Sequence, residues 1–151
     1  MPARATQEAL RRQFGQWGLP VRLRVDNGHP WGKKEEVPQV LALWLTGLGL
    51  GVHWNPATSP QHNGVVEVGQ RIGQRWAEPW LCHSVAELQR RVDEEDRVQR
   101  QVYPVTQGKS RWELFGGLAH SGRLYSEEWE GENWDLQRVW NTSAAIGGSA
   151  R

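Results

Sequence analysis

The fold and the candidate site are both decided around one stretch, VRLRVDNG at residues 21–28. Apolar and basic residues alternate over residues 21–25, and this period of two is typical of a strand with one solvent-exposed face. The turn-forming residues Asp26-Asn27-Gly28 follow directly and indicate that the strand ends there. Because ligands of α/β sheets bind at the carboxyl ends of strands, Asp26 is the first candidate site residue.

The segments around this strand predict an α/β chain that is rich in helix. Apolar spacing and turn residues mark five further elements. They are a helix over 6–17, a helix over 37–48 that we expect to be buried nearly all round, a short strand over 52–54, a helix from Gly64 to about Pro79, and a helix from Ser84 to about Val102. Ser84 and Glu87 form the capping-box pattern that starts the last of these helices.

The sequence changes character after Tyr103, where Leu, Ile, Val and Phe become rare. We expect residues 105–151 to form an irregular tail, with one helical turn capped by Ser110 and another near Leu136. The end of the chain, from Ser143, is expected to be frayed. Four tryptophans of this region are expected to be largely exposed: Trp112, Trp129, Trp134 and Trp140.

Composition limits the function classes. The chain has 151 residues, a net charge of +1 and one cysteine, which excludes a disulfide framework and any zinc site built from several cysteines. Its longest apolar run is too short for a membrane span, and its N-terminus lacks the apolar segment of a secretory signal, so we expect a cytoplasmic protein. The charges sum to +4 over residues 1–75 and −3 over residues 76–151. A basic first half is a mild indication of nucleic-acid binding.

A second candidate acid lies in the helix that starts at Gly64. Glu67 falls in the first turn, and helical spacing places it on one polar face with Gln70, Arg71, Gln74, Arg75 and Glu78. A carboxylate at a strand end and one at a helix N-terminus can converge on Mg²⁺, which needs only one or two protein carboxylates. On spacing alone a simpler interpretation is favoured, in which Asp26 forms a turn and Glu67 interacts with the helix dipole.

The exact residues of the two motifs favour the metal-site interpretation instead. Residues 25–28 (VDNG) and 55–67 (NPATSPQHNGVVE) closely resemble the integrase catalytic core of retroviral integrases and of the D,D,E transposases of bacterial insertion sequences. The resemblance covers roughly residues 15–104. In that family the Asp of the D-N-G turn and the Glu of the P-Q-x-x-G-x-x-E segment are the second and third metal-binding carboxylates. They match Asp26 and Glu67, with 40 residues between them.

The resemblance implies a ribonuclease-H-like fold, with a mixed sheet flanked by helices. It also implies two Mg²⁺ or Mn²⁺ ions that activate water or a 3′-hydroxyl for in-line attack on a phosphodiester. The implied partner is double-stranded DNA, both transposon ends and target. The predicted DNA-binding residues are Asn27, Gln61, Asn63, Gln70, Arg71, Gln74 and Arg75.

The chain also departs from the family pattern. The first family carboxylate lies on an early strand, whereas residues 1–25 contain no Asp and Glu8 lies on the predicted first helix. We therefore expect a partial integrase core over residues 1–104 that lacks the first strands. The tail at 105–151 would lead toward a missing C-terminal β module.

Two functions remain open on the sequence. The first is a fragment of a transposase, inactive alone and holding its metal ions only weakly, whose partner is the missing N-terminal portion. The second is a non-catalytic DNA-binding or interaction module derived from a transposase. The first is favoured slightly, because both motif acids, Asp26 and Glu67, are present.

Overall fold

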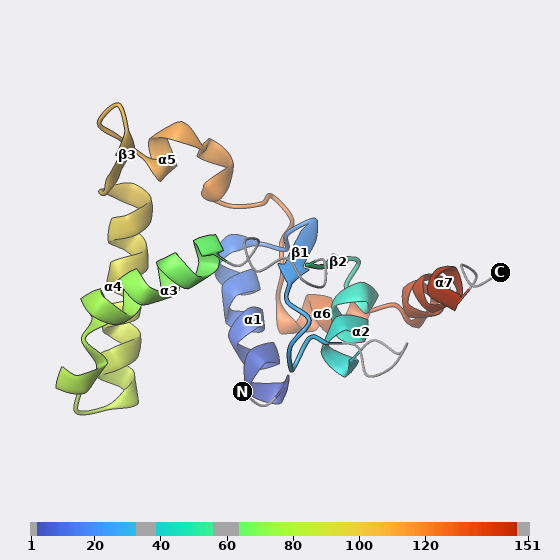
Figure 1. Cartoon of the computed structure of the whole chain (residues 1–151). Coiled ribbons are helices and arrows are strands. Elements are labelled where there is room, and N and C mark those ends of the chain that lie inside the picture. The colour runs from blue at the N-terminus through green and yellow to red at the C-terminus, as the bar shows by residue number, and fades with distance from the viewer. Residues whose placement is uncertain (1–2, 33–38, 56–63, 148–151) are drawn as a thin grey trace. The chain divides into compact units, whose positions relative to one another are not determined.

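The computed structural model describes residues 3–32, 39–55 and 64–147 (Figure 1). The chain is α/β and rich in helix, with two small two-stranded sheets among these residues. It forms two compact units, one of Met1–Thr58 with His120–Arg151 and one of Ser59–Ala119. The unit boundaries along the chain fall after Thr58 and after Ala119. No helix of the described part is long and apolar enough to cross a membrane.

The described part of the first unit contains six helices and strands, and all of them except α6 were expected at least in part from the sequence. They are α1 (Ala3–Trp17), β1 (Arg22–Val25), α2 (Val40–Gly47), β2 (Gly51–Trp54), α6 (Glu127–Asn133) and α7 (Leu136–Gly147). Helix α1 ends at Gly18, whose φ is +76° and whose amide donates to Phe14 O at 2.8 Å. A Cβ at Gly18 would lie 2.3 Å from Ser121 Oγ, so both its backbone and its surroundings require glycine.

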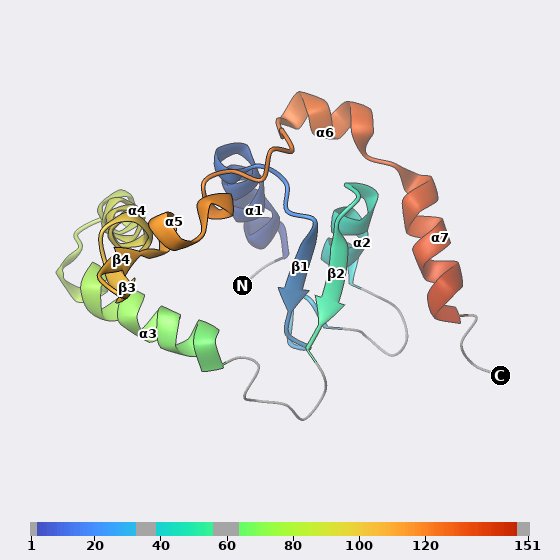
Figure 2. The ribbon, with the colours of Figure 1, turned by 90° about the horizontal axis from the view of Figure 1, so that it is seen from above.

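Strands β1 and β2 pair in parallel, and Figure 2 shows both arrows running in the same direction. The register joins Arg22 to Gly51 and Val25 to Trp54. Helix α2 connects them, as parallel strands require a crossover segment between them.

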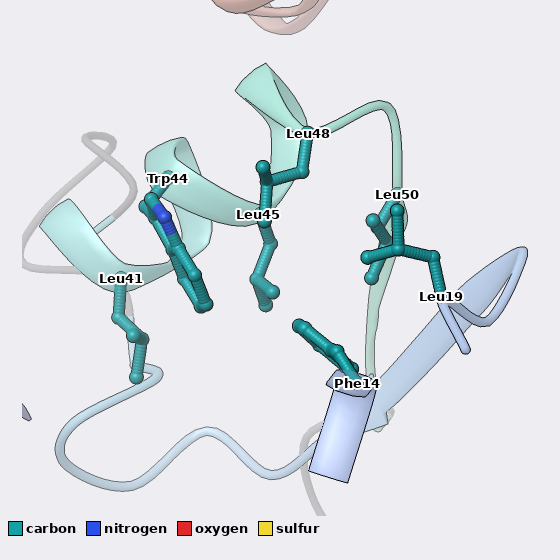
Figure 3. Close-up of a cluster of buried hydrophobic side chains, with 7 residues drawn as sticks. All are labelled: Phe14, Leu19, Leu41, Trp44, Leu45, Leu48 and Leu50. Carbon is teal, nitrogen blue, oxygen red and sulfur yellow. The ribbon is translucent and has the colours of Figure 1, made fainter. Parts of the chain in front are cut away.

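The core of the first unit lies where α1 and α2 meet the sheet (Figure 3). Its buried side chains are Phe14, Leu19, Leu41, Trp44, Leu45, Leu48 and Leu50. Four of these residues belong to α2 or to its C-terminal end, which confirms the expectation of a deeply buried helix. Val40 is the exception, at 77 % exposure.

A polar cluster joins three helices beside this core. The Glu130 carboxylate of α6 accepts hydrogen bonds from Arg11 Nη2 at 2.6 Å, Arg11 Nε at 3.0 Å, Trp44 Nε1 at 2.9 Å and the Tyr125 hydroxyl. Burial opposes ionisation of this carboxyl group, but the hydrogen bonds from Arg11, Tyr125 and Trp44 outweigh it and lower the pKa of Glu130 to about 2. Burial and the bond to Glu130 raise the pKa of Tyr125.

The C-terminal segment differs from the expected irregular tail. Its described part contains α6 and α7, and the backbone of α7 stays helical through Gly147, beyond the point where fraying was expected. Trp129 packs against the core, and Trp134 Nε1 donates to Trp44 O at 3.2 Å. A Cβ at Gly47 would lie 2.1 Å from Trp134 Nε1, so the indole ring packs against α2 only because residue 47 has no side chain. Large aromatic surfaces here replace the aliphatic residues that the segment lacks.

Exposure of the four tryptophans is correspondingly mixed. Trp140 is exposed at 64 %, as expected. Trp134 is exposed at only 38 %, and Trp112 and Trp129 are half-buried. The expectation that all four are largely exposed is wrong, because it was drawn from local composition and took no account of contacts across 90 residues, such as that between Trp134 and Trp44.

The second unit is a helical hairpin followed by a β-turn segment. Its elements are α3 (Gly64–Ala77), η2 (Pro79–Leu81), α4 (Val85–Gln101), β3 (Pro104–Thr106), β4 (Lys109–Ser110), α5 (Arg111–Leu114) and η3 (Gly116–Leu118). The predicted caps form: the Ser84 hydroxyl accepts from Glu87 N at 3.1 Å, and Ser110 closes a full capping box with Glu113. The hairpin β3–β4 was not predicted. Its turn residues Gln107 and Gly108 both have positive φ, as a two-residue hairpin turn requires.

Candidate metal and nucleic-acid site

Asp26 lies at the carboxyl edge of the parallel pair. It follows Val25, the last residue of β1. Val25 is paired in register with Trp54, the last residue of β2, and Asn55 follows Trp54. Asn27 Nδ2 donates to Asn55 O at 2.8 Å, which joins the two strand ends. The Asp26 side chain is exposed. The predicted position of this acid at a strand end is confirmed.

The turn after Asp26 is fixed by local hydrogen bonds. Asp26 Oδ1 accepts from Gly28 N at 3.1 Å, and Gly28 O accepts from the amides of Trp31 at 2.9 Å and Gly32 at 2.8 Å. Trp54 Nε1 donates to Trp31 O at 2.8 Å and ties the turn to β2. The Oδ2 oxygen of Asp26 makes no hydrogen bond with another described residue. The turn therefore holds one carboxylate oxygen and leaves the other available on the exposed edge.

Glu67 lies in the first turn of α3 and is exposed, as the sequence predicts. The side chains of Gln70, Arg71, Gln74 and Arg75 are exposed on the same helix. Within the described part of the chain, neither Arg71 nor Arg75 forms an ion pair or a side-chain hydrogen bond. Gln61 and Asn63, the other two residues predicted to contact DNA from this segment, lie outside the described residues.

The end of α3 differs from the expectation. The helix stops at Ala77, and Glu78 adopts a left-handed conformation with φ 47°. Its carboxylate pairs with Arg91 of α4 at 3.3 Å. The prediction that Glu78 shares the polar face of this helix is therefore wrong, because the chain turns before Glu78 reaches that face.

The donor chemistry at both positions fits a hard divalent cation. Mg²⁺ takes oxygen ligands and keeps several waters, so one or two carboxylates are sufficient protein ligands. Among the described residues, no three His, Cys, Asp or Glu side chains gather in one place. Asp26 belongs to the first unit and Glu67 to the second. Their convergence on one cation stays a prediction.

The sequence analysis assigned no binding role to the basic residues of β1 and β2. Arg22 and Arg24 of β1 and His53 of β2 are all exposed. The alternation of basic and apolar residues over 21–25 was the pattern from which this could be inferred, because it places both arginines on one face.

Comparison with known proteins adds no assignment to this geometry. No protein-family model matches the chain, and no solved structure matches it significantly. The similarity to the integrase core therefore depends on the two motifs that contain Asp26 and Glu67.

Proposed function

We propose that the chain is part of a D,D,E transposase or integrase and acts in metal-dependent strand transfer on DNA. Asp26 and Glu67 are assigned as metal-binding carboxylates within a partial ribonuclease-H-like core. The observation that best supports this is the exposed Asp26 carboxylate at the carboxyl edge of a parallel strand pair, with one oxygen unused by the turn. This edge is where α/β folds bind their ligands.

Each residue of the proposed site has a defined part. Asp26 and Glu67 hold Mg²⁺ or Mn²⁺, which when bound supplies Lewis-acid activation of a water or 3′-hydroxyl nucleophile and of the leaving oxygen. Asn27 fixes the strand ends beside Asp26 through its bond to Asn55 O. Arg71 and Arg75 of α3 contact DNA phosphates, and the neighbouring Gln70 and Gln74 donate hydrogen bonds to the DNA backbone.

This chain supplies two of the three carboxylates of the family pattern, since residues 1–25 contain no Asp. Two carboxylates bind a pair of ions less well than three. We therefore expect weak metal binding and no strand transfer by this chain alone.

A paramagnetic experiment tests the metal site without requiring activity. In two-dimensional NMR spectra, Mn²⁺ is expected to broaden the amide signals next to Asp26 and next to Glu67 together, and Asp26→Asn is expected to remove the broadening at both. Glu8→Gln serves as the matched control, because Glu8 is exposed and pairs only with Arg4 among the described residues. Broadening at only one of the two acids would contradict a shared site.

A second function is supported by Arg71 and Arg75, which are exposed and form no ion pair with any residue that the structure describes. These residues suit DNA binding without chemistry, as in a non-catalytic module derived from a transposase. DNA affinity that is unchanged in Asp26→Asn and Glu67→Gln, with or without Mg²⁺, would favour this module. Nicking of DNA by the chain alone that disappears in Glu67→Gln would contradict the expectation of an inactive fragment.

A further inference from the structure

A basic face lies on the parallel sheet of the first unit. We define the basic sheet face as Arg22, Arg24 and His53, all of which are exposed. Arg24 and His53 are register partners, and paired residues of a parallel ladder point to the same side of the sheet. Strands β1 and β2 lie side by side (Figure 2), and the register, which pairs Arg22 with Gly51 and Arg24 with His53, places the three residues on one side of the sheet.

The atoms around Gly51 confirm this grouping. A Cβ at Gly51 would lie 3.2 Å from Cγ of Arg22 and 3.6 Å from Nε2 of His53. The Arg22 stem and the His53 ring therefore lie beside the same glycine, on one side of the sheet. The opposite side of the sheet presents Leu23 and Val52, which pack against the core.

The two arginines of the basic sheet face have no carboxylate partner among the described residues. In the part of the chain that the structure describes, none of the three residues forms an ion pair or a side-chain hydrogen bond. Parallel sheets are normally covered by apolar layers on both faces. An apolar cover over Arg22 and Arg24 would bury two unpaired cations, which is strongly unfavourable. An anionic partner is the complementary occupant.

We propose that the basic sheet face binds the phosphate backbone of duplex DNA and directs it toward Asp26. Residues two apart on a strand are separated by about 6.6 Å, so Arg22 and Arg24 present two guanidinium groups at fixed spacing. Guanidinium groups bind phosphate oxygens bidentately. Asp26 follows Arg24 at the same two-residue interval, so a bound strand passes directly to the proposed metal ligand. This inference rests on the proposed function and adds a DNA-contact surface separate from α3.

The test measures the affinity of the full chain for a fluorescent duplex over a range of salt concentrations. Each phosphate contact contributes about 0.9 to the slope of log K against log salt. The variant Arg22→Gln/Arg24→Gln is therefore expected to flatten the slope by about 1.8 and to weaken binding about 60-fold at 0.1 M salt. Arg22→Lys/Arg24→Lys keeps both charges and is expected to retain most of the slope. The control Arg12→Gln/Arg90→Gln removes two exposed charges elsewhere and is expected to leave the slope nearly unchanged.

The outcomes separate this inference from the proposed function. If Arg22→Gln/Arg24→Gln leaves affinity and slope unchanged while Arg71→Gln/Arg75→Gln reduces them, the basic sheet face is not a DNA surface, although the proposed function stands. The same conclusion follows if the Gln variant only aggregates more readily, since charged residues also protect sheet edges. If the chain binds an acidic peptide and does not bind DNA, both proposals are overturned. An urea titration of each variant checks that the fold is retained.

Discussion

Replacing Glu130 by Gln is expected to lower the free energy of unfolding of the first unit by about 3 kcal/mol at pH 7. The carboxylate accepts four hydrogen bonds from Arg11, Trp44 and Tyr125, and its side chain is only 13 % exposed. These bonds lower the pKa of Glu130 from its ordinary 4.5 to about 2. A lowering of this size corresponds to about 3 kcal/mol of preferential stabilisation of the charged form.

The pH dependence has a definite sign. A carboxyl group whose pKa is lower in the folded state stabilises the fold fully above its unfolded value, here 4.5, and loses this contribution as pH falls toward 2. The difference in stability between the natural chain and Glu130→Gln is therefore expected to be largest above pH 5. By pH 3 it is expected to fall to about half or less.

Urea unfolding at pH 7 and at pH 3, with hydrogen exchange of the α2 amides to report on the first unit, measures both quantities. At an m value of about 2 kcal/mol per molar, the midpoint of Glu130→Gln is expected about 1.5 M lower at pH 7. Glu128→Gln is the matched control, since Glu128 is an exposed residue of the same helix, and it is expected to change stability by less than about 0.5 kcal/mol. A deficit of the same size at both pH values would refute the argument.

Three further predictions concern packing and capping. Leu45→Ala removes a side chain with 0 % exposure and is expected to cost about 3 kcal/mol, measured by urea unfolding. Ser84→Ala removes the cap of α4 and is expected to cost about 1 kcal/mol, seen as faster amide exchange at Glu87, while Ser126→Ala should leave those amides unchanged. Gly47→Ala places a methyl group against Trp134 and is expected to cost about 1–3 kcal/mol, with a changed tryptophan spectrum; an unchanged spectrum would contradict that contact.

Local patterns were sufficient to predict most of the elements. The alternation over 21–25 predicted β1, the apolar spacing over 37–48 predicted a buried helix that is described as α2 from Val40, and Ser84 and Ser110 cap their helices as expected. In each of these the deciding interaction lies within a few residues of the chain. The same is true of Asp26, whose position depends on one strand and one turn.

Long-range packing was not predictable in this way. Glu130 lies in a run of acidic residues, and only its proximity to Arg11, 119 residues away, makes it a structural residue. Trp134 likewise owes its packing to Trp44 and Gly47, which lie far from it in the sequence. The prediction that Glu78 lies on the polar face of α3 was wrong for a local reason. Glu78 itself adopts the left-handed conformation, and its side chain pairs with Arg91 instead. Helical spacing assumes that the helix continues, so it does not predict a residue at which the backbone leaves the helical conformation.

The charged residues of this chain fall into two physical groups, and the division bears on function. Glu130 and Glu78 are bound by arginines, so their charges contribute to the fold. Arg24, Arg71 and Glu67 are exposed and form no ion pair within the described part of the chain. An exposed unpaired charge adds little to stability, and its neutralisation usually changes the free energy of unfolding by less than about 0.5 kcal/mol. Neutral variants of the second group are therefore expected to fold normally, so that any loss of metal or DNA binding in them reports on the site itself.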